Sequence, residues 1–378
     1  MWTRFQKLPL AISIPTLFIA MLMIPSLHGF ISGDPHKGRI FFYAMLLGLF
    51  GLTFLRFSLQ GAVFPMHRYA QLWSLFAFFL GFPILLAIPL YEVIGTGQFI
   101  DTYLDIVSTV TTTGLPIFAP SSLTETLIIW RVSLGWASGF LIWVFAWSVF
   151  APLNLGGFEH LGARGETMNQ SQGARQTVGR LPAEKFWREA LRLGPVYLWI
   201  TLAAALALLL VSGDPSYAML RAMATIATFG IEIPGQSGAG GVPGEAILAV
   251  VMLFALSRST FSTVFARARK WRVTEDPELR VAAGLVLVAT LVLIGHGAHS
   301  VADLGARLEL IWGALFTSLS FLTTTGLASE SLPSGLLNLD PVEIILVALA
   351  MIGGGVATTA GGIKLLRVVI LAGHSRAE

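Results

Sequence analysis

Three short segments of this apolar sequence combine threonine with glycine. Polar loops 1, 2 and 3 read Thr111-Thr112-Thr113-Gly114, Ala227-Thr228-Phe229-Gly230 and Thr323-Thr324-Thr325-Gly326. Glycine adopts the positive φ angles that β-branched residues resist, so carbonyl oxygens in such loops can be aimed at one axis. Threonine adds a hydroxyl acceptor without adding a charge. Rings of carbonyl oxygens replace the hydration shell of a monovalent cation in selectivity filters. The loops therefore predict a cation site.

The expected ion is K⁺, with Na⁺ second. The expected filter residues are Thr112, Thr113, Gly114, Thr228, Phe229, Gly230, Thr324, Thr325 and Gly326. Near the ends of the loops only Glu232 is acidic, whereas a filter for Ca²⁺ or Mg²⁺ would be expected to use carboxylates. The alternative is that each loop is only a polar helix end stopped by glycine. Because the loop pattern occurs in three places along the chain, we favour the filter over this alternative.

Composition places these loops in a membrane protein. Of 378 residues, 55% are hydrophobic and 12% are charged, against about 25% charged in soluble domains. A formal charge of +3 is too small to suggest nucleic-acid binding, and the absence of cysteine excludes disulfides and thiolate chemistry. Neither His-Glu-x-x-His nor Gly-x-Ser-x-Gly occurs, so no enzyme is predicted. We expect an all-α polytopic membrane protein surrounded by lipid.

Apolar stretches of about 20 residues predict the membrane spans. We expect eight spans, at 8–32, 40–60, 71–95, 124–152, 193–212, 243–265, 281–301 and 341–371. Three further stretches, at 99–118, 215–233 and 306–329, end in the polar loops. Lys and Arg concentrate at 153–192 and 266–280, and the opposite side offers chiefly Lys37, Arg39 and Arg307. This asymmetry predicts two cytoplasmic termini if the three further stretches are re-entrant pore loops.

The pattern of helix, re-entrant loop and helix occurs three times. Its marker glycines are Gly114, Gly230 and Gly326, at spacings of 116 and 96 residues. The predicted domains are an N-terminal helix pair (1–68), pore repeat 1 (69–160), a basic cytoplasmic loop (161–192), pore repeat 2 (193–275) and pore repeat 3 (276–378).

Longer motifs resemble the TrkH/KtrB superfamily of bacterial potassium transporters, and the TrkH branch in particular. They are VSTVTTTGLPIF (107–118), LIIWRVSLGWASGFLIWVFAWSVFAPLNLGGFE (127–159), DPELR (276–280), SFLTTTGLAS (320–329) and GGGVATTAGGIKLLRVVIL (353–371). The resemblance implies a pore of four repeats in the bacterial inner membrane, subunits paired as homodimers, and a cytoplasmic nucleotide-binding regulator of the TrkA type. Only three repeats are found here. The fourth is on a separately encoded chain, or the sequence is truncated, or the pore closes differently.

The resemblance also implies an intramembrane gate. The glycine-rich segment (residues 353–362) resembles the family's helix break, and five glycines in ten residues do not hold a regular helix well. The expected gate residues are Gly353, Gly354, Gly355, Thr358, Thr359, Gly361 and Gly362. Phe229 stands where the family usually has a small residue, so we expect it to narrow or distort polar loop 2.

Arg258 and Arg131 are two of the arginines that lie within apolar stretches. Arg258 lies midway along a predicted span, and an ionisable residue there is a functional hypothesis by default. Family members carry a pore arginine from the fourth repeat, for which Arg258 is a candidate substitute. The alternative, equally weighted, is that Arg258 snorkels or pairs with a backbone carbonyl. Arg131, beside Trp130, is expected to be an interfacial anchor.

The sequence thus predicts a potassium or monovalent-cation transport subunit. A second interpretation is a non-conducting assembly or regulatory subunit whose pore is incomplete. A secondary transporter is weaker, because the repeats look parallel and lack an intramembrane acid for proton coupling.

Overall fold

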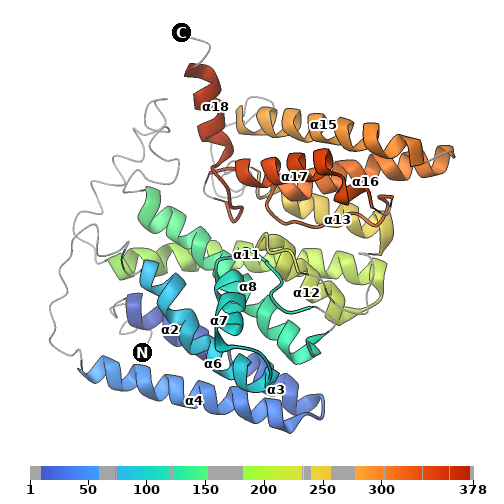
Figure 1. Ribbon diagram of the computed structural model, residues 1–378. Coiled ribbons are helices and arrows are strands. Elements are labelled where there is room, and N and C mark those ends of the chain that lie inside the picture. The colour runs from blue at the N-terminus through green and yellow to red at the C-terminus, as the bar shows by residue number, and fades with distance from the viewer. Residues whose placement is uncertain are drawn as a thin grey trace. The chain divides into compact units, whose positions relative to one another are not determined.

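The structure is a computed structural model made of helices. It describes residues 10–58, 73, 75–119, 122–151, 182–231, 233, 240–256, 277–300, 303–333, 335–356 and 358–374. Over these ranges there are helices and no strand, so the predicted all-α class is confirmed (Figure 1). The elements are α2 (Leu10–Ala20), α3 (Met23–Ile31), α4 (Pro35–Ser58), η1 (Ala77–Gly81), α6 (Phe82–Ile94), α7 (Phe99–Val110), α8 (Glu125–Phe145), η3 (Ala146–Phe150), α11 (Pro182–Ser212), α12 (Pro215–Ile226), α13 (Gly241–Leu253), α15 (Pro277–Gly297), η7 (Ala298–Ser300), α16 (Leu304–Leu322), η8 (Leu336–Asn338), α17 (Asp340–Ile352) and α18 (Leu365–His374).

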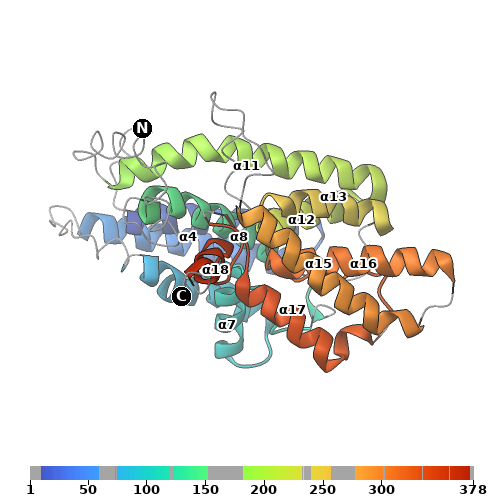
Figure 2. The same ribbon diagram turned by 90° about the horizontal axis from the view of Figure 1, so that it is seen from above.

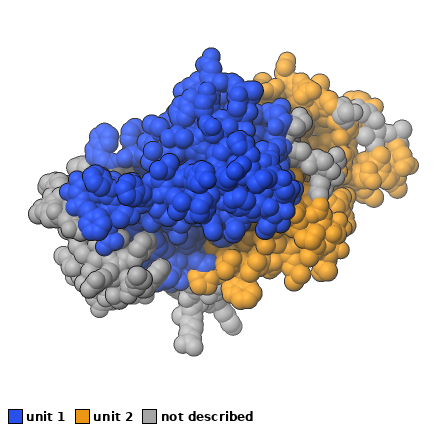
Figure 3. Space-filling view, turned by 90° about the horizontal axis from the view of Figure 1, so that it is seen from below, with its two compact units in different colours: residues 1–153, 168–194 blue, residues 154–167, 195–378 orange. Residues whose placement is uncertain are grey.

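The chain divides into two compact units (Figure 3). Unit 1 contains residues 1–153 and 168–194, and unit 2 contains residues 154–167 and 195–378. Polar loop 1 belongs to unit 1, whereas polar loops 2 and 3 and the glycine-rich segment belong to unit 2.

Unit 1 is centred on α8, which positions α7. In the most apolar 18-residue stretch of the span that includes α8, 78% of the residues are buried, whereas in that of α4 only 11% are buried. The indole of Trp130 on α8 is fully buried and lies 6.1 Å from the ring of Phe41 on α4. Helix α7 begins with a capping box between Gln98 and Asp101, which satisfies backbone donors at its first turn. The capping box thus fixes where α7 begins, and the helix ends at Val110, directly before polar loop 1.

In unit 2, α15, α16 and α17 lie side by side (Figures 1 and 2). Asp303 caps α16 by accepting a hydrogen bond from the Gly305 backbone N–H at 3.2 Å. Asp214 caps α12 by accepting one from Tyr217 at 3.1 Å, with proline at the first helical position. Such caps satisfy the free donors of a first turn and start both helices at defined residues.

Six helical segments of the described chain are long and apolar enough to cross a membrane. They are Ile12–Ile31, Pro35–Ser58, Ala77–Ile94, Glu125–Phe150, Ala183–Ser212 and Glu278–Gly297. They correspond to six of the eight predicted spans. The stretch 243–265 contains only the 13-residue helix α13 within the described residues. The stretch 341–371 is not one helix: the chain leaves α17 at Gly353, where φ is +73°, and becomes helical again at Leu365. This interruption falls at the glycine-rich segment, where the resemblance led us to expect a helix break.

Helix α11 begins at Pro182, inside the stretch predicted to be a cytoplasmic loop. The physical reason is an apolar stripe that the loop prediction overlooked. Phe186 and Trp187 are buried, and the Phe186 ring lies 5.2 Å from that of Phe145. Packing of these rings stabilises the first turns of α11 despite the surrounding basic residues.

Candidate ion site

The three polar loops share one backbone turn. The middle threonine of each, Thr112, Thr228 or Thr324, has a positive φ, at +56°, +51° and +58°. The next N–H donates to the carbonyl five residues earlier, with N···O distances of 2.8 Å in loop 1, 2.9 Å in loop 2 and 2.8 Å in loop 3. Two identical tetrapeptides and a different third one therefore adopt the same chain reversal.

Each turn directly follows the carboxyl end of a short helix. Helix α7 ends at Val110, α12 at Ile226 and α16 at Leu322. The last carbonyls of a helix lack intrahelical partners, and the helix dipole places about half a negative charge at this end. Three helix ends can therefore favour a cation although no residue of the loops is acidic.

Serine and threonine hydroxyls fix loops 1 and 3 from within. Ser108 Oγ accepts a hydrogen bond from Leu115 N at 2.8 Å, and Ser320 Oγ accepts one from Leu327 N at 2.6 Å. The first and third threonine hydroxyls of each loop also pair, at 2.8 Å in loop 1 and 3.0 Å in loop 3. Loop 2 has Ala224 in place of the serine, so its turn is held without this bond.

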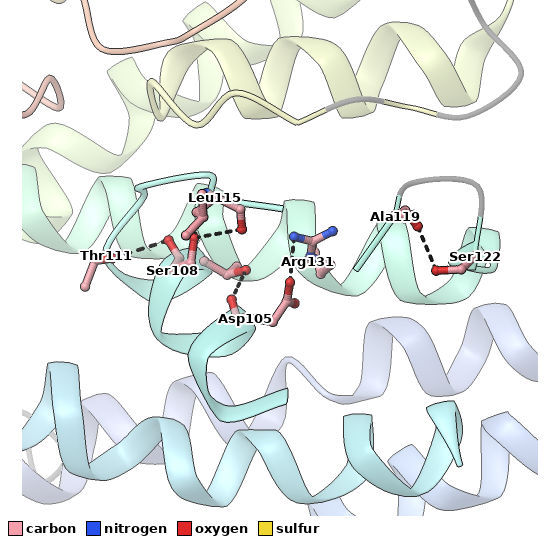
Figure 4. A network of polar contacts seen from close by, with 8 residues as sticks. Asp105, Ser108, Thr111, Leu115, Ala119, Ser122 and Arg131 are labelled. Atoms are coloured by element: carbon pink, nitrogen blue, oxygen red, sulfur yellow. Dashed lines mark hydrogen bonds and ion pairs between the residues drawn. The ribbon is translucent and has the colours of Figure 1, made fainter. Parts of the chain in front are cut away.

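A second support comes from the residue three positions before that serine or alanine. In loop 1 it is Asp105, whose carboxylate lies 2.9 Å from Arg131 Nη2 (Figure 4). In loop 2 it is Arg221, whose Nη1 donates to the Ile231 carbonyl at 2.9 Å. In loop 3 it is Thr317, whose hydroxyl accepts from Ser329 N at 3.0 Å. Side chains of three different types thus occupy the same position behind the three loops, and each makes a polar contact there.

The expectation that Arg131 is an interfacial anchor is wrong. Arg131 is 2% exposed and Asp105 is 0% exposed, so the guanidinium is buried against its partner. Burial of a charge is costly unless it is paired. The available sequence signal was an aspartate in the middle of α7 and an arginine on α8, the two helices that flank polar loop 1.

Phe229 does not distort the turn of polar loop 2, because Thr228 keeps its positive φ and Phe229 N keeps its bond to Ala224 O. The Phe229 side chain is fully buried. Gly230 differs from Gly114 and Gly326, which have φ of +75° and +73°, because its own φ is not positive. It is glycine for another reason: a Cβ there would collide with the Thr325 carbonyl oxygen. Loops 2 and 3 are therefore in direct backbone contact.

The glycine-rich segment touches these same two loops. Gly361 N donates to Thr324 Oγ1 at 2.8 Å, and Thr359 Oγ1 donates to the Ile226 carbonyl at 3.1 Å. Gly353 and Gly362, with φ of +73° and +82°, lie backbone against backbone, where a Cβ on either would clash. The described residues of the segment are thus non-helical and pack on the ends of α12 and α16.

The structure brings the predicted residues of unit 2 together. Thr228, Phe229 and Thr325 are buried, and Gly326 is exposed. In unit 1, Thr113 is exposed and Thr112 and Gly114 are half-buried. Arg258 lies outside the described residues. In the part of the chain that the structure describes, no group of three His, Asp or Glu side chains could hold a metal ion.

Apolar spans that alternate with helices ending in uncharged polar turns define a polytopic membrane protein. No family model matches the chain. The potassium uptake protein TrkH of Escherichia coli K12 is 29% identical over 283 residues, which cover 72% of this chain and 54% of that protein. TrkI of Halomonas elongata is 23% identical over 299 residues, 78% of this chain and 56% of that protein.

The fold agrees with these matches. The crystal structure of the potassium transporter TrkH from Vibrio parahaemolyticus superposes with a TM-score of 0.77 at 22% identity, covering 96% of this chain and 74% of that one. The chain has the TrkH fold, and its resemblance to the TrkH/KtrB superfamily is confirmed. These relatives are ion transporters and not enzymes. The chain spans about half the length of the relatives that it matches in sequence.

Proposed function

We propose that this chain is a potassium transport subunit in which K⁺ passes along backbone carbonyls and threonine hydroxyls of the three polar loops. The observation that carries the proposal is the repeated turn, with a left-handed threonine at the carboxyl end of each short helix. The matched relatives are named as potassium uptake proteins. The three helix–loop–helix stretches, 69–160, 193–275 and 276–378, are the pore repeats, and 1–68 forms a separate helix pair.

The chemistry of the loops supports a monovalent ion. Carbonyl dipoles and neutral hydroxyls replace the water around K⁺, whereas Ca²⁺ and Mg²⁺ sites are built mainly from charged oxygen ligands. The loops offer no carboxylate. K⁺ is therefore the proposed ion, and Na⁺ is the competitor to be tested.

The glycine-rich segment is the proposed gate. Its residues Gly353, Gly354, Gly355, Thr358, Thr359, Gly361 and Gly362 form or flank a non-helical stretch that is bonded to polar loop 3 and to the end of α12. A small number of hinge residues that change their φ and ψ angles is enough to open and close such a stretch. Deleting residues 356–360 should raise cation flux, and unchanged or lower flux at a normal membrane level would make the segment structural packing.

The setting of the subunit follows from the resemblance and from the charge asymmetry. We place it in a bacterial inner membrane with both termini in the cytoplasm, as a homodimer bound to a TrkA-like nucleotide-binding regulator. The basic stretch 161–181, which precedes α11, would then face that regulator.

The test is growth of a bacterium that lacks potassium uptake, on low K⁺, with this chain expressed alone or with its genomic neighbours. The wild-type chain should restore growth in at least one of these settings. Gly326→Ser and Gly114→Ser should reduce the preference for K⁺ at unchanged membrane levels. Absence of rescue in every setting, with the protein present in the membrane, would support a non-conducting assembly subunit instead.

A further inference from the structure

Glu245 is a buried acidic side chain near the start of α13, a helix that is otherwise apolar. Its exposed fraction is 4%. A carboxylate removed from water is stable only when hydrogen-bond donors or a positive charge replace the lost hydration. The contacts of Glu245 therefore show what it does in the fold.

Three donors converge on this carboxylate. Trp312 Nε1 donates to Oε2 at 2.7 Å, Ser329 Oγ donates to Oε2 at 2.9 Å, and Glu330 N donates to Oε1 at 3.2 Å. Ser329 Oγ accepts a bond from Ser331 N at 3.1 Å, which leaves its own hydrogen for Glu245. Indole and backbone N–H groups only donate, so an ionised carboxylate is the matching acceptor.

These donors belong to both arms of polar loop 3. Trp312 lies on α16, before the loop, whereas Ser329 and Glu330 follow Gly326 on the returning chain. Ser329 N is also bonded to Thr317 Oγ1 on α16 at 3.0 Å. One side chain from the helix after polar loop 2 thus fastens the helix before loop 3 to the chain after it.

We infer that Glu245 is a positioning residue for polar loop 3, and the inference rests on the proposed function. It sets the ion preference through Ser329 and Glu330, because the carbonyls of Thr324, Thr325 and Gly326 keep their spacing only while both arms are held. Charge-assisted hydrogen bonds are stronger and shorter than neutral ones, which suits a clamp of this kind.

Glu245→Gln tests the clamp with almost no change in volume. A glutamine has one acceptor oxygen, so its amide NH₂ must face either the Trp312 indole N–H or the Glu330 N–H. Glu343→Gln is the matched control, because Glu343 lies near the start of α17, also a helix that follows a polar loop, and is exposed. Trp312→Phe removes one of the three donors. The double variant Glu245→Gln/Trp312→Phe should therefore be closer to wild type than Glu245→Gln alone, because the glutamine NH₂ no longer faces an indole N–H.

The first measurement is hydrogen–deuterium exchange of the purified chain in detergent, and it does not depend on transport. Amides of residues 327–331 should exchange about tenfold faster in Glu245→Gln, as expected for one lost bond to a charged group, and should be unchanged in Glu343→Gln. If Glu245→Gln does not fold, Trp312→Phe should show a smaller increase at the same amides. Unchanged exchange in the folded variants would overturn the inference.

The second measurement is the ratio of K⁺ to Na⁺ uptake in the conducting assembly. It should fall several-fold in Glu245→Gln, recover in part in the double variant, and stay at the wild-type value in Glu343→Gln. If Glu245→Gln showed faster amide exchange but a wild-type ratio of K⁺ to Na⁺ uptake, Glu245 would have a structural role only, and the inference about ion preference would be wrong. A wild-type protein that transports neither ion would count against the proposed function, while the exchange result would still decide whether the clamp exists.

Discussion

Polar loops 1 and 2 reach the same backbone turn with different side chains behind it. Loop 1 uses the buried Asp105–Arg131 pair and the Ser108 hydroxyl, whereas loop 2 uses Arg221 on a backbone carbonyl and has alanine in place of the serine. The φ of the middle threonine nevertheless differs by only a few degrees, +56° against +51°. The two loops therefore share the backbone geometry. The side-chain interactions that hold it differ, and we expect them to contribute different amounts to the free energy of unfolding.

The largest difference is expected between Arg131→Met and Arg221→Met. Arg131→Met leaves the fully buried Asp105 carboxylate unpaired, which should lower the free energy of unfolding by about 3–5 kcal/mol. Arg221→Met removes one hydrogen bond from a half-buried arginine to the Ile231 carbonyl and should cost about 1–2 kcal/mol. Denaturant unfolding in mild detergent measures both.

Asp105→Asn/Arg131→Met sharpens this comparison. The introduced asparagine has nearly the shape of the aspartate and removes the unpaired buried charge. The double variant should recover most of the lost stability. Equal losses in the single and double variants would show that Arg131 acts through packing and not through its charge.

Next in size is the contrast between Gly230→Ala and Gly326→Ala. Gly326 needs its positive φ but has open space around a Cβ, so alanine should cost about 1–2 kcal/mol in backbone strain. At Gly230 a Cβ meets the Thr325 carbonyl, which must shift, at a cost of about 3 kcal/mol. Gly230→Ala should therefore disturb the K⁺ to Na⁺ uptake ratio more than Gly326→Ala. The reverse order would mean that loops 2 and 3 are not in contact.

The smallest effect is expected from Ser320→Ala and Ser108→Ala. These substitutions give loops 3 and 1 the alanine that loop 2 has at the same position. Each substitution removes the acceptor of one backbone N–H, that of Leu327 or of Leu115, for about 1 kcal/mol. Thermal unfolding should show a small decrease for both. Because Ala224 already occupies this place in loop 2, the preference for K⁺ should survive, and its loss would show that the serine hydroxyl is part of the site.

Much of this organisation could be predicted from the sequence, because apolar length and basic loops are local signals. They located six spans, and the three further stretches at 99–118, 215–233 and 306–329 contain the carboxyl ends of α7, α12 and α16. The supports behind the loops depend on tertiary packing and were missed. Glu245 and Trp312 are 67 residues apart, and only the fold brings them within 2.7 Å. The five glycines of residues 353–362 indicated a helix break from the sequence, but the backbone contact between Gly353 and Gly362 also depends on the fold.

The left-handed threonines have a consequence for how mutations at these positions should be interpreted. A β-branched residue is among the poorest choices for this region of φ, and such outliers cost of order 1–3 kcal/mol each. Thr112, Thr228 and Thr324 therefore make the chain less stable than glycine or asparagine would. Substitution by glycine or asparagine would relieve this strain and at the same time remove the threonine hydroxyl. A screen for thermostable variants should accordingly recover substitutions at these threonines, and those variants should be the ones that lose transport.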